Sequence, residues 1–149
     1  MKNIYDVLKL ENQLCFPIYA CAREIAKKYK PFLNRIDLTY TQYIAMMVIW
    51  EKEKLNVKEL GKYLYLDSGT LTPVLKKLES KGYIKRTRSK YDERNLIVTL
   101  TDRGDKLREQ AVEIPMQVGK CVKLKLEEAQ ELYKLLYKML NNMNETALT

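Results

Sequence analysis

The sequence predicts a mainly α-helical fold that carries one small β-hairpin, and three observations support this. Apolar residues recur at helical spacing over residues 4–30 and again over residues 107–143. Two short segments with helix-capping residues lie between them, at residues 56–63 and 68–81. The runs YIKRTRS and NLIVTLT follow, are rich in β-branched residues, and flank the polar stretch KYDER, which is typical of a hairpin.

The first predicted helix covers residues 4–30 and ends before Pro31, because the residue before a proline disfavours helical geometry. Pro17 interrupts this helix. A proline removes one helical N–H and crowds the preceding turn. Either the helix kinks at residues 13–16, or a new helix starts at Pro17. The second case puts Cys15 beside a helix N-terminus, whose partial positive charge favours an anion.

A second helix is expected to begin at Thr39. Thr39 and Gln42 have the spacing of a capping box, in which each side chain accepts a hydrogen bond from a free backbone N–H. The run YIAMMVIW that follows is apolar on nearly every side. A helix of this kind is expected at the centre of a fold.

The two short helices predict a helix-turn-helix. Asn56 is placed to cap the first, which extends to Tyr63, and Asp67 or Ser68 to cap the second. Gly82 suits the left-handed conformation that ends a helix. Two short helices joined by a tight connection fit a helix-turn-helix, and the hairpin after them is expected to form a wing.

The terminal helices are predicted to lie outside this compact centre. One begins at Thr101 and Asp102, and Pro115 should bend or break it. The last carries its apolar residues over positions 126–143. Each is amphipathic and has to bury its apolar stripe, which a second subunit would do.

Composition narrows the class of protein. The 149 residues, 46% of them hydrophobic, suit one domain with a true core. A formal charge of +8 favours a polyanionic partner such as nucleic acid, or an anionic membrane surface. There is no signal-peptide pattern and no apolar run of membrane-spanning length, so we expect a cytoplasmic protein with reduced thiols. With no histidine and no CxxC spacing, neither a metal site nor a cofactor is expected.

The basic charge is concentrated in one segment. The segment from Lys58 to Arg94 contains ten basic and five acidic residues, so it supplies +5 of the formal charge of +8. Because these charges coincide with the helix-turn-helix and wing, they fit a DNA groove better than a membrane-binding face. Asp92 is expected to pair with Arg86 or Arg88 and brace the wing. The candidate DNA contacts are Ser68, Gly69, Thr70, Thr72, Pro73, Lys76, Lys77, Arg86, Arg88, Lys90 and Arg94.

The stretches LDSGTLTPVLKKLESKGYIKRTRS, DERN and VTLTDRG resemble the MarR family of winged helix-turn-helix repressors, over nearly the whole chain. LENQLCF, together with LTYTQY and LDSGTLTP, is similar to the organic-hydroperoxide-sensing OhrR branch and related staphylococcal thiol-based regulators. The resemblance implies an obligate homodimer formed by the N- and C-terminal helices. It also implies a recognition helix at about 68–81 in the major groove and a pseudo-palindromic double-stranded operator. We therefore expect one domain over residues 1–149, with dimerisation segments at about 1–35 and 104–149 and a DNA-binding lobe at about 38–101.

In the OhrR branch the reactive cysteine lies in the QLCF motif, which here is Cys15. The resemblance further implies that Tyr19, Tyr29 and Tyr40 hydrogen-bond its thiolate. Tyr19 lies one helical turn from Cys15. Tyr29 is roughly 21 Å further along a straight helix, so it would have to come from the other subunit.

The other two cysteines receive different interpretations. Cys21 is about 9 Å from Cys15 along the helix axis, too far for a disulfide within one helix. Cys121 lies on an apolar stripe and either packs in an interface or, as the resemblance implies for two-cysteine members, acts as the resolving thiol.

Three functions are compatible with this sequence. The first is a transcriptional repressor that releases its operator when an organic hydroperoxide oxidises Cys15, as part of an oxidative stress response. The second is a repressor released by a small phenolic or aromatic ligand. The third is a thiol peroxidase. It is disfavoured because no arginine lies beside Cys15 in the sequence, and the nearest is Arg23. A regulator rather than an enzyme is expected.

Overall fold

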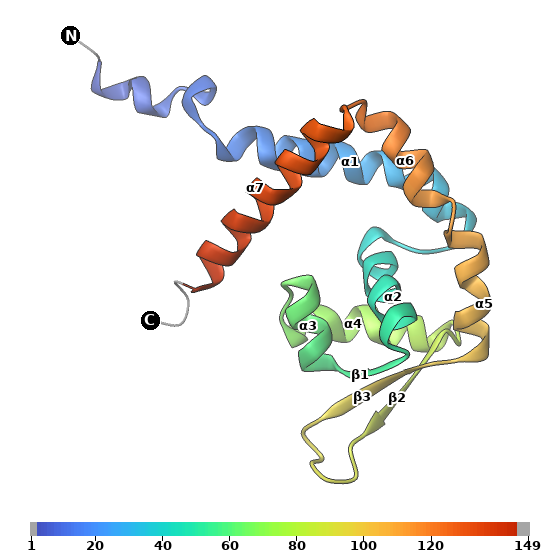
Figure 1. The fold of residues 1–149 in the computed structure, drawn as a ribbon. Helices are drawn as coiled ribbons and strands as arrows, with labels where there is room; N and C mark the ends of the chain where they lie inside the picture. Colours follow the sequence, from blue (N-terminus) through green and yellow to red (C-terminus); the bar gives the residue numbers. More distant parts are fainter. Residues whose placement is uncertain (1–2, 146–149) are drawn as a thin grey trace. The chain divides into compact units, whose positions relative to one another are not determined.

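The computed structural model describes residues 3–145 (Figure 1). These fall into two compact units, one up to Val118 and one from Gly119. The chain order is η1 (Ile4–Leu8), η2 (Leu10–Asn12), α1 (Cys15–Arg35), α2 (Tyr40–Lys52), β1 (Lys54–Asn56), α3 (Val57–Leu64), α4 (Ser68–Ser80), β2 (Ile84–Arg88), β3 (Leu96–Leu100), α5 (Asp102–Ala111), α6 (Ile114–Val122) and α7 (Leu126–Glu145). The η segments are 3₁₀ helices.

Helix α2 is the centre of the first unit, as its apolar sequence predicts. Ala45, Met46 and Ile49 are fully buried, and they pack with residues of α3, α4 and α5 in one core. The predicted capping box is confirmed. The Thr39 hydroxyl accepts from the Gln42 N–H at 3.2 Å, and the Gln42 side chain accepts from the Thr39 N–H at 3.1 Å.

The predicted helix-turn-helix is confirmed as α3 and α4. Asn56 and Glu59 form a capping box at the start of α3. Asp67 caps α4 by accepting from the Thr70 N–H at 2.7 Å. Gly82 follows α4 with φ +78°, the left-handed conformation expected there. Local capping chemistry therefore sets the limits of both helices.

The predicted hairpin forms as β2 and β3, and the short strand β1 joins it. The antiparallel order is β1-β3-β2, with Val98 opposite both Leu55 and Arg86. The sequence did not reveal β1, because three residues carry no periodic pattern. Its partner β3 is supplied by the chain more than forty residues later.

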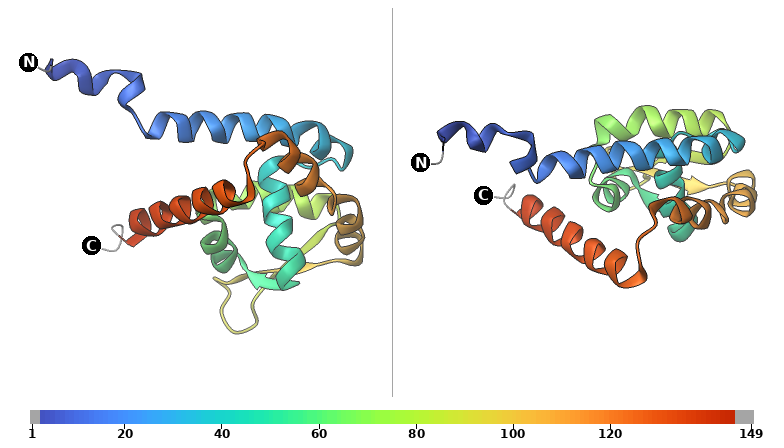
Figure 2. Two further views of the ribbon diagram at one scale, coloured as in Figure 1. Left: turned by 45° about the horizontal axis from the view of Figure 1, so that its top comes forward. Right: turned by 90° about the horizontal axis from the view of Figure 1, so that it is seen from above.

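The continuous first helix predicted over residues 4–30 is wrong in two respects. Residues 4–12 form two short 3₁₀ helices, and α1 begins only at Cys15, a break that Figure 2 shows. Helix α1 then continues through Pro31 to Arg35. Pro17 is the third residue of α1, in the first turn, where an N–H would have no helical acceptor in any case. Because α1 starts at Cys15, Pro17 removes no hydrogen bond from the helix.

The helix is interrupted just before Pro115, as predicted. Helix α5 ends at Ala111, and α6 begins at Ile114. In the second unit, α7 displays exposed apolar side chains along its length. Among the described residues, no helix is both long and apolar enough to cross a bilayer.

Candidate functional site

The N-terminal turn of α4 displays small polar groups. Ser68, Gly69 and Thr70 are exposed, whereas the Thr72 hydroxyl donates to the Ser68 carbonyl at 2.7 Å and is half-buried. Pro73, inside α4, has no N–H to donate to the Gly69 carbonyl. The predicted contacts at the start of this helix thus lie on one exposed turn, apart from the Thr72 hydroxyl.

The pairing predicted for Asp92 is wrong. The Arg86 guanidinium binds Glu79 instead, with Nε and Nη2 each 2.9 Å from Oε2, and the Arg86 N–H donates to Oε1 at 2.9 Å. Because α4 packs beside β2, Glu79 is nearer to Arg86 than the wing tip is. These hydrogen bonds hold the pKa of Glu79 below its ordinary value. Arg86 therefore links the recognition helix to the wing and is only partly accessible.

Asp92 instead organises the turn at the wing tip. Its carboxylate accepts from the Arg94 N–H at 3.0 Å, and its carbonyl accepts from the Asn95 N–H at 2.9 Å. The Arg88 guanidinium donates to the Glu93 carbonyl at 3.1 Å. These bonds leave Lys90 and Arg94 exposed at the end of the hairpin, where a cation is free to approach a polyanion.

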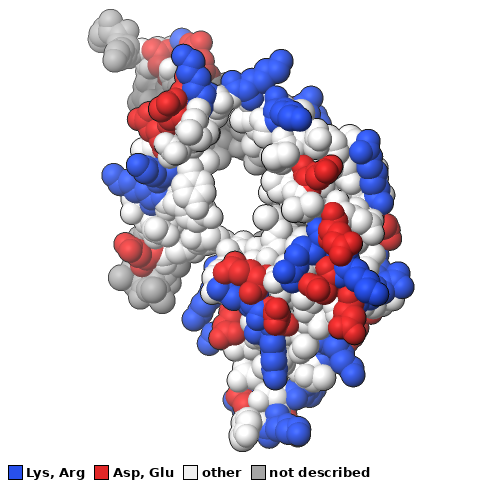
Figure 3. All heavy atoms as spheres, turned by 45° about the vertical axis from the view of Figure 1, so that its right-hand side comes forward, with Lys and Arg blue, Asp and Glu red and all other residues white. Residues whose placement is uncertain are grey.

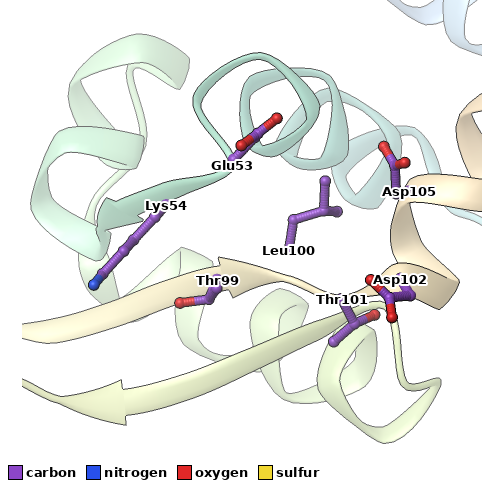
Figure 4. Close-up of a pocket in the computed structure, with 7 residues that line it drawn as sticks. All are labelled: Glu53, Lys54, Thr99, Leu100, Thr101, Asp102 and Asp105. Atoms are coloured by element: carbon purple, nitrogen blue, oxygen red, sulfur yellow. The ribbon is translucent and has the colours of Figure 1, made fainter.

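Charge is distributed unevenly over this unit. Lys76 and Lys77 are exposed on α4. On the face shown in Figure 3, acidic and basic side chains alternate. A hollow of about 340 Å³ between β1, β3 and α5 carries carboxylates and would repel a polyanion (Figure 4). It is lined by Glu53, Lys54, Thr99, Leu100, Thr101, Asp102 and Asp105.

Cys15 is the first residue of α1 and is exposed. This is close to the second sequence alternative, with the helix starting two residues before Pro17 rather than at it. The N–H groups of a first helical turn point toward this end, where an anion is stabilised. Tyr19 lies one turn further on, and its ring contacts the Arg23 guanidinium, 5.0 Å from the ring centroid.

Tyr29 and Tyr40 come together at the junction of α1 and α2, with ring centroids 4.9 Å apart. A third ring, Tyr43, lies 5.7 Å from Tyr29 and 6.4 Å from Tyr40. Burial raises the pKa of Tyr29 and of Tyr40, and burial with the two neighbouring phenols raises the pKa of Tyr43 to about 12. All three therefore remain neutral hydrogen-bond donors at physiological pH.

Sequence reasoning missed Tyr43. Its spacing of three from Tyr40 on one helix was the available signal, because such residues share a face. Within one chain, fourteen positions of α1 separate Cys15 from Tyr29. That is roughly 21 Å along the axis, so this cluster does not meet the cysteine of its own subunit.

Cys21 and Cys121 are also exposed, on α1 and α6 respectively. Over residues 3–145 there is no group of three or more histidine, cysteine, aspartate or glutamate residues suited to hold a metal ion.

A helix-turn-helix followed by a basic β-hairpin defines the winged helix-turn-helix transcriptional regulators. The sequence profile of the SarA/Rot transcriptional regulators matches residues 27–111. The chain belongs to the MarR family of such regulators, in the branch of the organic hydroperoxide and SarZ proteins.

Two curated relatives illustrate this placement. The organic hydroperoxide resistance transcriptional regulator of Bacillus subtilis (strain 168) is 47% identical over 145 residues, which is 97% of this chain and 99% of the relative. The regulator SarZ of Staphylococcus aureus (strain USA300) is 48% identical over 123 residues, 83% of each chain.

Solved structures agree with the fold. Reduced AbfR bound to DNA matches with a TM-score of 0.77 at 36% identity, covering 93% of this chain and 96% of AbfR. A disulfide-formed AbfR matches with a TM-score of 0.62 at 34% identity, covering 94% and 95%.

Proposed function

We propose that this protein is a homodimeric transcriptional repressor that binds its operator when reduced and releases it when an organic hydroperoxide oxidises Cys15. One observation carries the proposal: an exposed cysteine begins α1, and Tyr29 of the same helix forms a cluster of neutral phenols with Tyr40 and Tyr43 of α2. Two relatives support the same function. One is a transcriptional regulator of organic hydroperoxide resistance, and the other, AbfR, binds DNA in its reduced form.

The chemistry requires no cofactor. The Cys15 thiolate attacks the terminal oxygen of the hydroperoxide, forming an S–O bond as the O–O bond breaks. The departing alkoxide takes a proton and leaves as the alcohol, and Cys15 becomes a sulfenic acid. Tyr19 of the same chain, with Tyr29 and Tyr40 of the partner subunit, would donate hydrogen bonds to the sulfur and its oxygen.

A dimer would explain the exposed apolar side chains at both ends of the chain. Leu14, Phe16 and Tyr19 lie uncovered at the start of α1, and Leu132 and Tyr133 along α7. Apolar surface of this extent marks an interface. We place the dimerisation segments at about residues 1–35 and 104–149 and the DNA-binding lobe at about 38–101, within one functional domain.

DNA recognition would use α4 in the major groove and the wing in the minor groove. Ser68, Gly69 and Thr70 lie at the helix end that approaches base edges and phosphates. Lys76, Lys77, Arg88 and Lys90 would contact phosphates. Arg94 would enter the minor groove, where negative potential is enhanced.

The test measures operator release and cysteine chemistry on the same sample. A pseudo-palindromic operator is selected with the reduced wild-type protein, and its affinity is measured before and after one equivalent of cumene hydroperoxide. We expect wild type and Cys21→Ser to release the DNA, and Cys15→Ser to bind but not respond. A normal response from Cys15→Ser would refute the proposal.

Mass spectrometry of the oxidised sample decides the role of Cys121. A disulfide between Cys15 and Cys121 would make Cys121 the resolving thiol, whereas a mixed disulfide with a small thiol would make the chemistry one-cysteine. AbfR has a structure with a disulfide formed, so the Cys15–Cys121 disulfide is the outcome to look for first.

We further propose that the protein is a cytoplasmic sensor rather than an enzyme. Arg23 is engaged with the Tyr19 ring and lies about 12 Å along the helix axis from Cys15, where it would not polarise a bound peroxide. Because dithiothreitol reduces the sulfenic acid back to the thiol, the measured quantity is the steady rate of peroxide consumption above that of Cys15→Ser with the same dithiothreitol, and this rate should be slow. Rapid sustained turnover would show a peroxidase instead.

A further inference from the structure

Lys81, directly after α4, contacts the connection between α1 and α2. Its ammonium donates to the Asp37 main-chain carbonyl and lies 3.2 Å from the Asp37 carboxylate. It also reaches the Gln42 Oε1 at 3.4 Å. One side chain of the recognition-helix segment therefore contacts one acceptor of Gln42 at the start of α2 and two acceptors of Asp37 in the turn that connects α1 to α2, more than thirty residues away in sequence.

That turn is constrained on both sides. Asp37 adopts φ +52°, a conformation that few non-glycine residues take. Gln42 is 3% exposed, and its Oε1 also accepts the Thr39 N–H of the α2 capping box. The Lys81 ammonium thus contacts both Asp37, in the connection after α1, and the Gln42 side chain of the α2 capping box.

The same turn leads directly to the phenol cluster. Tyr40 is the first residue of α2, three positions after Asp37, and its ring lies against Tyr29 of α1. A displacement of Tyr40 would move the start of α2, because Thr39 and Gln42 bond to each other across it. Lys81 is bound to the part of the chain that would move.

The contact between Lys81 and Asp37 lies beside open space, so the side chains can change position. An open hollow of about 650 Å³ borders it, lined in part by Asn34, Asp37, Lys77 and Lys81. The Asp37 side chain is 86% exposed. An ion pair with so exposed a partner contributes little to folding stability, so its loss should affect geometry more than stability.

We propose that Lys81 is a positioning residue that couples the phenol cluster at the α1–α2 junction to the recognition helix. This inference rests on the proposed function. An oxidised Cys15 of the partner subunit would displace Tyr29 or Tyr40, the start of α2 would shift, and Lys81 would carry that shift to the C-terminal end of α4. The recognition helix would then turn in its groove.

The measured quantity is the release ratio, defined as the operator Kd after one equivalent of cumene hydroperoxide divided by the Kd before it. Lys81→Met removes the ammonium and keeps the aliphatic stem. Lys81→Arg keeps donors within reach of Asp37. Lys106→Met, at an exposed lysine of α5, is the control for the loss of one surface charge. The rate of Cys15 oxidation, followed by mass spectrometry, is recorded for every variant.

We expect Lys81→Met to lower the release ratio by about 3- to 30-fold, the range for single residues that modulate coupling between sites. Its Cys15 oxidation rate should remain that of wild type, and its Tm should fall by less than about 4 °C. Lys81→Arg should keep most of the ratio and Lys106→Met all of it. In the Lys81→Met background, Asp37→Asn should have no further effect, because the two residues act through one contact.

The outcomes are separable. If wild type does not release its operator, the proposed function fails before Lys81 is tested. If wild type releases and Lys81→Met has an unchanged ratio, the coupling role is refuted. A Tm loss of more than roughly 10 °C in Lys81→Met would assign Lys81 a structural role and would equally overturn the proposal.

Discussion

A methyl group added at Gly104 tests how closely α5 packs on the turn that precedes the wing. A Cβ at this position would lie 2.1 Å from the Tyr83 carbonyl oxygen and 2.9 Å from Leu100 Cδ1. The first distance is more than 1 Å inside ordinary van der Waals contact, and the nearest atom belongs to the backbone. Helix α5 would have to move away from the sheet.

That movement would disturb two hydrogen bonds. The Trp50 indole donates to the Gly104 carbonyl at 2.8 Å, and the Gly104 N–H donates to the Thr101 cap at 3.0 Å. Overpacking costs about 1–3 kcal/mol and a lost buried hydrogen bond about 1–3 kcal/mol, whereas the helix preference of alanine returns about 1 kcal/mol. We expect Gly104→Ala to lose about 1–5 kcal/mol, a Tm decrease of roughly 2–20 °C.

Urea unfolding followed by circular dichroism measures this at a fixed protein concentration, because dimerisation makes apparent stability concentration-dependent. Gly119→Ala is the matched control, since a Cβ there meets no atom within 4 Å and should leave stability equal or raise it by about 1 kcal/mol. A Gly104→Ala protein as stable as wild type, or more stable, would refute the packing argument.

Three further predictions follow from single contacts. Trp50→Phe keeps an aromatic side chain but removes the indole N–H and some buried volume, so the Gly104 carbonyl loses its donor and urea unfolding should show a loss of at least about 1–3 kcal/mol. Because the pKa of Glu79 is held below its ordinary 4.5 by Arg86, its stabilising effect is complete above that value and is lost as pH falls through the lowered pKa. Glu79→Gln should therefore lose stability at neutral pH and show a shallower acid dependence than wild type. The pKa of Tyr43 is raised from 10.0 to about 12, so the folded protein should lose stability as pH rises through this interval. Absorbance titration at alkaline pH should show a late phenol ionisation that Tyr43→Phe removes, and an unchanged titration would contradict the assignment.

Local signals account for what was predicted correctly. The starts of α2, α3 and α4 follow from Thr39, Asn56 and Asp67, whose side chains satisfy backbone N–H groups within three residues. Gly82 ends the helix-turn-helix for a similarly local reason. Such chemistry depends on near neighbours in the chain and is visible without a tertiary structure.

The errors have equally specific causes. Periodic apolar residues at positions 4–14 suggested a helix continuous with α1, but periodicity does not separate an α-helix from short 3₁₀ turns, and Pro17 favoured a start nearby. Asp92 was expected to pair with Arg86 or Arg88, whereas packing of α4 beside β2 brings Glu79 to Arg86, and Arg88 donates to the Glu93 carbonyl. The first error is local in origin, whereas in the second the partner of Arg86 is close in space and comes from another element.

The sequence by itself determined the class of this protein: a helix-turn-helix with a basic wing, and a QLCF motif near the N-terminus. That Cys15 begins a helix was decided by the structure. Only the tertiary structure decided that Tyr43 joins Tyr29 and Tyr40, and that Lys81 holds the turn between α1 and α2. The physical reason is that a cap or a turn is formed by residues a few positions apart. A phenol cluster or an ion pair between distant segments exists only after the core has packed them together.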